Sequence, residues 1–367
     1  QVAAELTQLE QEGTQLVDAA AGVRRALITR AQVVATTLAQ LALNRDVHSR
    51  DFDHVIVDEV SAALPPYVVY AASRAARGVT LLGDFLQNGP ISALPDDTKE
   101  PVADRWLLRD AFAVLGITSA EQAETSPGCS MLTEQFRFGP DVNELANRVA
   151  YGHRLQAGHQ HAPVLVDDGL PEIVFIDVDG LGSVAERKPG ARGSRWWPIG
   201  ALLSRALAAR HLDLKQRVGI VTPFTAQRDA TAALLQDADL DPKMVEVGTA
   251  HQFQGRQSDV VVLDLVEDGT GWISKAANRP EDRFSFGGFR VFNVGLTRTR
   301  GRIYVIATNA ALAKAKPGQP LASLRAMLDE GRAIRLGADE LVDVQRAPTA
   351  LPSPTVEDLR AALQGFS

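Results

Sequence analysis

The sequence contains little cysteine and no long apolar run. Its 367 residues include one cysteine, Cys129, which excludes an internal disulfide and a cysteine-rich zinc site and favours a reducing compartment. No apolar run reaches the ~18 residues that a membrane-spanning helix requires. The polar first residues are unlike a signal peptide. We therefore expect a cytoplasmic protein that has no membrane partner.

An excess of positive charge is also missing, since 38 basic residues face 45 acidic ones. Hydrophobic residues make up 45% and charged residues 23%, which is ordinary globular usage and excludes a disordered chain, a collagen and a coiled coil. Within residues 283–328, however, Lys and Arg occur without any Asp or Glu. This local surplus fits a polyanion such as a nucleotide or a nucleic-acid backbone, or alternatively a solvated face balanced by acids elsewhere.

Short apolar runs rich in β-branched residues alternate with helical patterns. The runs cover residues 31–36, 54–58, 79–84, 173–176, 217–221, 260–263 and 302–306. Helical patterns lie between many of them, for example over residues 141–149 and 198–209. Runs that are apolar on both faces are typical of parallel strands covered by helices. The sequence therefore predicts an α/β protein built from βαβ units.

Changes in composition predict four parts of the chain. Residues 1–28 are polar and helical, and we interpret them as the end of a helical insertion. Residues 29–165 and 166–345 each contain a group of strands, separated by a stretch rich in glycine and proline near residues 158–171. Residues 346–367 are predicted to form a Pro-rich linker and a terminal helix capped by Thr355.

Two neighbouring strands end in polar side chains. Asp58 and Glu59 follow the apolar run that ends at Val57. At a strand end one carboxylate can hold Mg²⁺ while its neighbour polarises a water molecule, or the two acids simply end the strand. Gln87 follows the next run and can bind both a phosphate oxygen and a water, although Gly83 and Asp84 could equally form an ordinary turn.

Three further motifs follow along the chain: Gln135-Phe136-Arg137, Phe253-Gln254-Gly255 and Asn293-Val294-Gly295-Leu296-Thr297-Arg298. With Asp58-Glu59 and Gly83-Asp84-Phe85-Leu86-Gln87, this order resembles the UPF-type branch of superfamily 1 helicases, superfamily 1B. The resemblance covers roughly residues 31–309. It implies two RecA-like parallel-sheet domains of the P-loop NTPase fold, the first incomplete at its N-terminus, with ATP and Mg²⁺ bound in the cleft between them.

The resemblance also implies roles for individual residues in ATP hydrolysis. Asp58 corresponds to the Mg²⁺ ligand and Glu59 to the residue that activates water. Gln87 corresponds to the sensor of the γ-phosphate, which Arg137 and Arg298 would reach from the two sides of an open cleft. Arginine suits that role because it is always charged and fork-shaped. Gly255 and Gln257 correspond to nucleotide-binding positions, and that of Gln257 lies beside the ribose.

For nucleic acid, the resemblance suggests contacts from hydroxyl, amide and imidazole groups: Thr36, Thr37, Thr222, Pro223, Gln227, Thr249 and His251. Such groups contact phosphates without reading bases. The threonines could instead cap strand ends, and His251 could be a packing residue. Trp196 and Trp197 could stack on bases, but the interpretation that we favour is buried anchors. The expected partner is single-stranded nucleic acid, DNA in preference to RNA, although no motif reports on the 2′-hydroxyl.

Three features depart from the family pattern. The chain contains no Gly-x-x-x-x-Gly-Lys-Ser/Thr loop for the phosphates and begins with Gln1 instead of Met, so we expect a piece of a longer protein that is inactive alone. Gln257 stands where the family commonly has Glu. Asn88-Gly89-Pro90 replaces the usual Leu-Pro-Pro after the sensor glutamine.

The leading hypothesis for function is therefore an ATP-driven helicase or translocase on single-stranded nucleic acid. A nucleic-acid-binding scaffold without hydrolysis is an alternative, because the phosphate loop is missing. A nucleotide-switched ATPase that remodels a protein partner is another. Stimulation of hydrolysis by single strands separates the motor from the remodelling enzyme.

Overall fold

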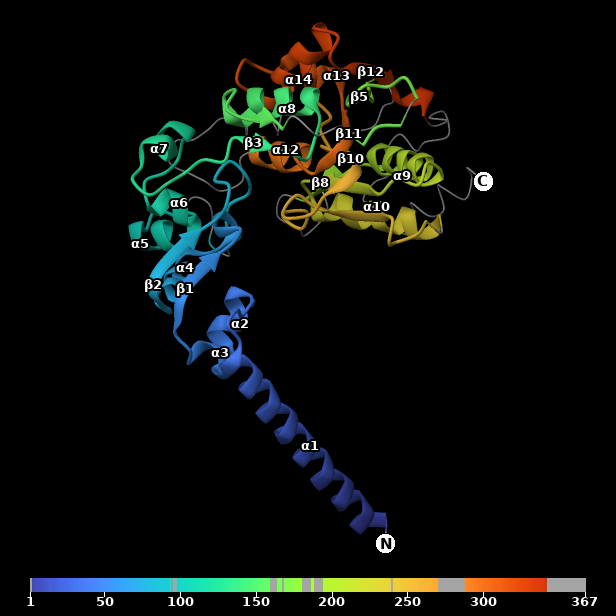
Figure 1. Cartoon of the computed structure of the whole chain (residues 1–367). Coiled ribbons are helices and arrows are strands. Elements are labelled where there is room, and N and C mark those ends of the chain that lie inside the picture. The colour runs from blue at the N-terminus through green and yellow to red at the C-terminus, as the bar shows by residue number, and fades with distance from the viewer. Residues whose placement is uncertain are drawn as a thin grey trace. The chain divides into compact units, whose positions relative to one another are not determined.

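A computed structural model describes residues 2–92, 94, 98–158, 164–166, 168–179, 186–187, 194–238, 240–269 and 288–341. The chain forms two compact units (Figure 1). Unit 1 comprises Gln1–Asp84 and Pro90–Leu115, and unit 2 comprises Phe85–Gly89 and Gly116–Ser367. These units divide the chain at other positions than the predicted domains, whose boundaries stay a prediction. The predicted linker and helix over 346–367 lie outside the described residues.

Unit 1 begins with a long helix and continues with short elements around two strands. In order these are α1 (Val2–Arg30), α2 (Leu38–Leu43), α3 (Arg45–His48), β1 (Phe52–Val57), η1 (Val60–Ala62), α4 (Pro65–Ala72), β2 (Ala75–Leu81), α5 (Pro101–Ala103), η2 (Asp104–Leu108) and α6 (Ala111–Val114). The prediction that the first 28 residues are helical is confirmed by α1. Its apolar side chains are largely exposed, Leu9 by 67% and Leu16 by 71%.

The core of unit 1 lies between its two strands and the helix that joins them. β1 and β2 are parallel and are connected through α4, which forms a βαβ unit as predicted. Buried Val57, Val60 and Val68 pack together there. Residues 31–36, predicted as a strand, are irregular, which corrects that prediction. An apolar run becomes a strand only where a neighbouring strand satisfies its backbone groups, and no ladder to this run exists within the described residues.

Unit 2 contains most of the regular structure. Its elements are α7 (Ala120–Thr125), β3 (Glu134–Gln135), α8 (Pro140–Ala146), η3 (Asn147–Tyr151), β4 (Gln156–Ala157), β5 (Ile173–Asp177), β6 (Glu186–Arg187), β7 (Arg195–Trp196), α9 (Pro198–Asp213), β8 (Val218–Thr222), α10 (Thr225–Asp237), β9 (Val245–Thr249), β10 (Ser258–Asp264), α12 (Gly288–Leu296), β11 (Thr299–Ala307), α13 (Asn309–Lys314), α14 (Pro320–Asp329), β12 (Ile334–Gly337) and η4 (Ala338–Glu340). Several helices start where the sequence supplies a proline at the first helical position, as Pro140 and Pro198 do.

A six-stranded parallel sheet organises unit 2, in the order β12-β5-β11-β10-β8-β9. One face packs on α9 and α10, where Trp197 and Leu203 join Ile220 and Val262 in the core. Gly295 of α12 lies against Leu263 on the opposite face. Enclosure on both faces explains why the central strands read as continuous apolar runs. The predicted α/β class with parallel sheets is confirmed.

One smaller expectation is also tested by unit 2. Trp196 and Trp197 are buried, at 5% and 0% exposure, so the prediction of buried anchors is confirmed. The strands β9 and β12 carry no apolar run long enough to have been predicted. No helix within the described residues is both long enough and apolar enough to cross a membrane.

Candidate functional site

Asp58 and Glu59 stand at the carboxyl end of β1 in unit 1. Asp58 is exposed, and its Oδ1 accepts a hydrogen bond of 2.9 Å from the Glu59 backbone N–H. Glu59 has φ of 51°, a left-handed conformation that is uncommon for a residue other than glycine. The backbone around this turn is fixed because Val60 donates to the Leu82 carbonyl at 2.9 Å and Leu82 to the Val57 carbonyl at 2.8 Å. The turn therefore fixes the direction in which the Glu59 side chain leaves the backbone.

The donor chemistry at this strand end fits a magnesium ion. An ionised carboxylate is a preferred Mg²⁺ ligand, and such ions are often held by one or two carboxylates together with phosphate oxygens. Hydrogen bonding to the Glu59 N–H occupies Asp58 Oδ1 and orients the carboxyl group. Its Oδ2 has no recorded partner within the described residues. Asp58 therefore has an oxygen to offer a metal, and Glu59 lies beside it.

Gln87, Arg137 and Arg298 meet in unit 2, although they are far apart in the sequence. The Nη2 of Arg298 donates to Gln87 Oε1 at 3.0 Å. The Nη1 of Arg137 donates to the Thr297 carbonyl at 2.8 Å, one residue before Arg298. The structure thus brings the three predicted phosphate-sensing residues to one place.

Arg298 is held much more tightly than an open cleft implies. Its side chain is 2% exposed, and its Nε donates to the Val294 carbonyl at 3.1 Å, while Nη2 also donates to Thr297 Oγ1 at 3.1 Å. The expectation that Arg298 lies open to solvent is therefore wrong. Anchoring by the preceding turn of α12 fixes the guanidinium in advance, which is what charge stabilisation of a transferring phosphoryl group requires.

Sequence reasoning named Asn293 and Thr297 within a motif but gave no role to these residues, which position the Gln87 segment. Asn293 is fully buried in α12, and its Nδ2 donates to the Leu86 carbonyl and to Tyr151 Oη, each at 3.1 Å. Thr297 Oγ1 in turn donates to the Asn293 carbonyl at 2.8 Å. The available signal was an Asn within the apolar run Val291-Phe292-Asn293-Val294, since a buried amide must find partners.

The residues predicted to contact nucleic acid have unequal exposure. Thr36 and Thr37 are exposed in unit 1, and Thr37 Oγ1 also caps α2 by accepting from Gln40 N at 3.1 Å. In unit 2, Thr249 is half-buried, and its N–H donates to Gln252 Oε1 at 2.9 Å. Burial lowers the pKa of His251, so its imidazole is neutral near pH 7.

Thr222 and Gln227 are both fully buried. This corrects the prediction that their side chains contact single-stranded nucleic acid. Thr222 pairs with Thr249 in the ladder between β8 and β9. Both ends of the Gln227 amide are used inside unit 2: its Oε1 accepts from Trp197 N at 2.8 Å, and its Nε2 donates to Asp264 Oδ2 at 2.6 Å. Pro223 is also buried.

Asp264 is the centre of this internal network. It is fully buried, and its Oδ1 accepts from Trp197 Nε1 at 2.8 Å and from Val266 N at 3.2 Å. Burial raises the pKa of Asp264 to about 6, although the three hydrogen bonds act in the opposite direction. One carboxyl group therefore joins the end of β10 to the starts of α9 and α10.

The two positions predicted to bind the nucleotide lie close together in the sequence after β9. Gly255 is exposed and has φ of 78°, a conformation that glycine adopts without strain. Gln257 is exposed two residues later.

The basic stretch over 283–328 does not form one positive surface. Arg290, Arg298 and Arg302 are buried, at 3%, 2% and 1% exposure, and Arg302 binds Asp168 through two bonds of 2.7 and 2.8 Å. Burial alone would raise the pKa of Asp168, but the hydrogen bonds from Arg302 and the Leu170 N–H lower it to about 2. The interpretation of this stretch as a polyanion groove is therefore wrong for Arg290 and Arg302.

Comparison with known proteins assigns the chain to a family. Two family models, both described as AAA domain, match residues 1–91 and 118–310. The chain belongs to the AAA-domain family. The ordered motifs of this AAA-domain chain resemble those of superfamily 1 helicases of the Upf1 type, and the relatives that it matches include proteins named as ATP-dependent helicases.

Three relatives illustrate the similarity. "Regulator of nonsense transcripts 1" of Dictyostelium discoideum is 23% identical over 79% of this chain and 21% of its own length. "ATP-dependent helicase upf1" of Schizosaccharomyces pombe is 26% identical over 80% of this chain and 30% of its own length. "5'-3' DNA helicase ZGRF1" of Mus musculus is 25% identical over 80% of this chain and 15% of its own length. The AAA-domain chain thus spans less than a third of the length of each of these relatives.

Proposed function

We propose that this chain supplies the ATP-hydrolysing and strand-binding core of an ATP-dependent helicase or translocase on single-stranded nucleic acid, DNA in preference to RNA. The observation that carries the proposal is the meeting of Gln87, Arg137 and Arg298 in unit 2. These residues come from three separate motifs, and an amide and two guanidinium groups suit a phosphate. The helicase names of the relatives support the same proposal.

In this proposal the residues of β1 and its turn act on water and metal. Asp58 would hold Mg²⁺, which neutralises charge on the phosphate oxygens when bound. Glu59 would orient the attacking water and accept its proton, helped by a backbone turn that fixes the direction of its Cα–Cβ bond. Gln87 and Arg298 would bind the γ-phosphate, and Arg137 would add positive charge. Gly255 and Gln257 would lie beside the nucleotide.

Strand contacts in the proposal come from exposed or half-buried groups. Thr36 and Thr37 in unit 1 and Thr249 and His251 in unit 2 remain candidates, because a phosphate can reach them. Buried Thr222, Pro223 and Gln227 would support these contacts from beneath. Such contacts do not read bases, which suits an enzyme that moves along any sequence.

Hydrolysis of ATP by the full-length protein, with and without single-stranded DNA, tests the proposal. We expect stimulation by the strand, and we expect Glu59→Gln to lower turnover by about 10²-fold or more while nucleotide binding persists, because the base is lost and Asp58 is retained. Glu10→Gln, an exposed change on α1, is the matched control. Near-normal turnover of Glu59→Gln would remove Glu59 from the reaction, and absence of stimulation would contradict a motor.

A further inference from the structure

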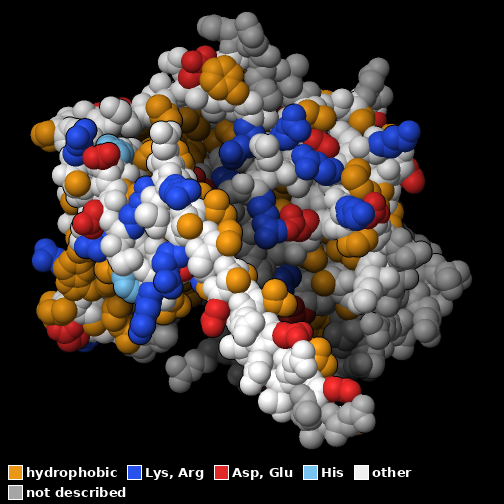
Figure 2. Space-filling view, turned by 60° about the horizontal axis from the view of Figure 1, so that its bottom comes forward, with side chains coloured by type: hydrophobic (Ala, Val, Ile, Leu, Met, Phe, Trp, Pro, Cys, Tyr) orange, Lys and Arg blue, Asp and Glu red, His pale blue; other side chains and the backbone are white. Residues whose placement is uncertain are grey.

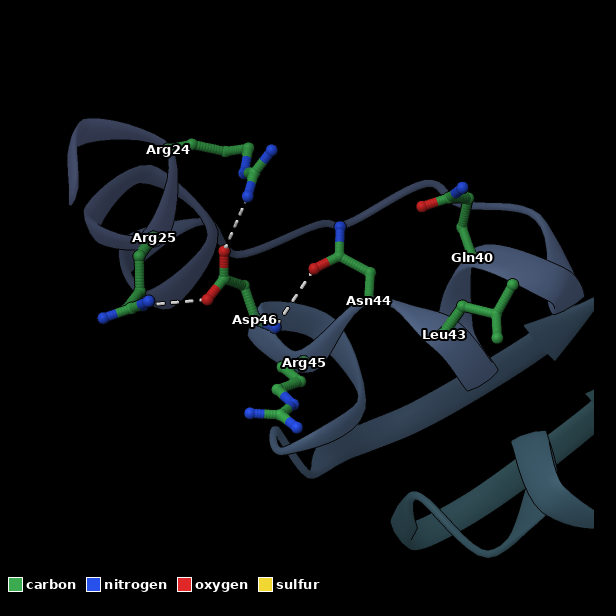
Figure 3. A pocket seen from close by; sticks show the side chains of 7 residues that line it. All are labelled: Arg24, Arg25, Gln40, Leu43, Asn44, Arg45 and Asp46. Carbon is green, nitrogen blue, oxygen red and sulfur yellow. Dashed lines mark hydrogen bonds and ion pairs between the residues drawn. The ribbon is translucent and has the colours of Figure 1, made fainter. Parts of the chain in front are cut away.

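A group of arginines lies at the inner end of α1, in unit 1. Arg24 and Arg25 of α1 and Arg45 of α3 line one open hollow together with Gln40, Leu43, Asn44 and Asp46. Figure 3 shows Arg24 and Arg25 reaching from the helix toward Asp46, with Arg45 on the adjoining helix. In the space-filling view, basic side chains gather beside this end of the projecting helix, and acidic ones lie further along it (Figure 2). The hollow therefore has a concentrated positive charge that the net charge of the chain conceals.

The single carboxylate of the hollow does not cancel this charge. Asp46 binds Arg25 at 2.8 Å and Arg24 at 3.3 Å, yet its side chain is 8% exposed whereas those of the two arginines are 69% and 61% exposed. Its hydrogen bond with Arg25 is the main reason that the pKa of Asp46 is lowered, so it stays ionised. The acid thus tethers two guanidinium groups from beneath and leaves most of their N–H donors facing solvent.

Arg45 adds a third guanidinium without an acid of its own. It is exposed, and no hydrogen bond or ion pair of its side chain is recorded within the described part of unit 1. Three positive charges against one negative leave a surplus of two around the hollow. A surplus of this kind attracts an anion from solution.

We propose that Arg24, Arg25 and Arg45 bind backbone phosphates of the single strand. The inference rests on the proposed function and extends its strand contacts to the base of α1. Guanidinium forks match phosphate oxygens, and the amides of Gln40 and Asn44 provide neutral groups of the kind that contact phosphates. The lining has no aromatic side chain on which a base could stack, so recognition is of the backbone and independent of sequence.

The hollow lies one short helix away from Thr36 and Thr37, which are predicted to contact the nucleic-acid strand. Gln40 lines it, and the backbone N–H of Gln40 donates to Thr37 Oγ1 at 3.1 Å. Thr37 and the hollow are separated by α2, a helix of 6 residues, which spans about 9 Å. A strand that contacts Thr36 and Thr37 can therefore continue over α2 and place its next phosphates against the arginines.

Binding of fluorescein-labelled oligo-dT by the 367-residue chain, measured by anisotropy at several salt concentrations, tests the inference. The variant Arg24→Gln/Arg25→Gln/Arg45→Gln should bind about tenfold or more weakly at low salt. The slope of log K against log salt concentration should become less steep by about 2, because each lost phosphate contact removes about 0.7 for a single strand. The matched control removes three exposed charges elsewhere, through Arg77→Gln/Arg217→Gln/Arg335→Gln, and should keep the slope of the unmodified chain.

The outcomes separate this inference from the proposed function. If the unmodified chain fails to bind oligo-dT at low salt, the proposed function fails. If it binds and the arginine variant has the same affinity and slope, only this inference is overturned. Displacement of oligo-dT by poly-glutamate at equal charge concentration would overturn it in favour of an acidic protein partner. If the triple variant does not fold, the single variant Arg45→Gln tests the inference instead. The Arg45 side chain makes no hydrogen bond or ion pair within the described part of unit 1, so its loss should not affect folding. An unchanged slope of this variant would refute the phosphate contact of Arg45.

Discussion

Arg298 combines two properties that are seldom found in one side chain, a permanent charge and almost complete burial. Hydrogen bonds to Gln87, Val294 and Thr297 make this burial tolerable. The same bonds mean that Arg298 serves both the fold and the proposed reaction. A substitution there has to be compared with one that removes structural bonds alone.

Arg298→Ala should therefore lower both turnover and stability. We expect turnover of ATP to fall about 10³-fold or more, as for other lost arginine fingers, and unfolding free energy to fall by about 1–3 kcal/mol, because buried acceptors lose their donor. Arg298→Lys should not restore turnover, since lysine lacks the planar fork. ATP turnover and melting temperature of the full-length protein are the measurements.

Arg325→Ala provides the control for stability. Arg325 donates to the carbonyls of Leu312, Ala313 and Ala315, so its loss should destabilise unit 2 to a similar degree without a specific effect on turnover. Equal turnover of the Arg298 and Arg325 variants would show that Arg298 acts on the fold only.

Asp264 predicts a pH dependence of stability. Its pKa in the folded chain is about 6, above the value of about 3.9 expected when unfolded. Between these values the folded state binds the extra proton, so the contribution of Asp264 to unfolding free energy falls as pH rises from 4 to 6, by up to about 3 kcal/mol. Denaturant unfolding of the wild type and Asp264→Asn across this range measures the contribution as a difference.

The difference between the wild type and Asp264→Asn is needed because other buried groups also make stability depend on pH. Burial also raises the pKa of Glu172, and it lowers the pKa of His211 and His251, which has the opposite effect on the slope. These contributions are the same in the wild type and in Asp264→Asn, so they cancel when one unfolding free energy is subtracted from the other. A constant difference from pH 4 to pH 6 would mean that the Asp264 carboxyl titrates as it does in the unfolded chain.

At the scale of elements, glycine shows how packing overrides helix propensity. Gly200 lies in the first turn of α9, where an added Cβ would overlap Trp197 Nε1 and the Asp264 carboxylate. Gly22 lies in α1 with no atom within 4 Å of such a Cβ. Alanine is the better helix former by up to about 1 kcal/mol, so the two positions should respond in opposite directions.

We expect Gly200→Ala to destabilise unit 2 by about 1–3 kcal/mol through overpacking, and Gly22→Ala to be neutral or to stabilise α1. Thermal unfolding followed by circular dichroism compares the two. A stabilising Gly200→Ala would mean that Trp197 and Asp264 can move apart, and that their network with Gln227 is not rigid.

Elements were predictable from the sequence where burial on both faces leaves an uninterrupted apolar run. The central strands β5, β8, β10 and β11 have this pattern, and each was predicted. The edge strand β9 alternates Val245, Glu246 and Val247, too short a pattern to identify, and residues 31–36 have strand composition without a ladder. A strand is defined by its neighbours, which composition does not report.

The site was predictable as a set of residue types but not as a set of contacts. Asp58, Glu59, Gln87, Arg137 and Arg298 were named from motifs, whereas the bond between Gln87 and Arg298 joins positions 211 residues apart. A strand-end acid in a motif and a buried one such as Asp264 look alike in a sequence. The Asp264 network therefore became visible only with the sheet in place.

At the scale of the whole molecule, the two compact units differ in how far their sheets are enclosed. In unit 2, β8, β10 and β11 each have a hydrogen-bonded strand on both sides, and nearly all their side chains are buried. In the described part of unit 1, β1 and β2 pair only with each other, and Ile56 and Leu82 are 64% and 44% exposed. The unit 1 sheet therefore has less buried surface to stabilise it against opening.

Amide hydrogen exchange should therefore separate the units, because exchange of a strand amide requires an opening whose free energy depends on the contacts that are broken. We expect peptides over β8 and β10 to exchange at least about 100-fold more slowly than those over β1 and β2, which corresponds to about 2.7 kcal/mol or more in opening free energy. Mass spectrometry after correction for intrinsic rates measures this, and α1, exposed along most of its length, supplies the fast reference. Equal protection of β2 and β8 would mean that the unit 1 sheet opens only when the whole chain unfolds, and that the two compact units are one cooperative structure.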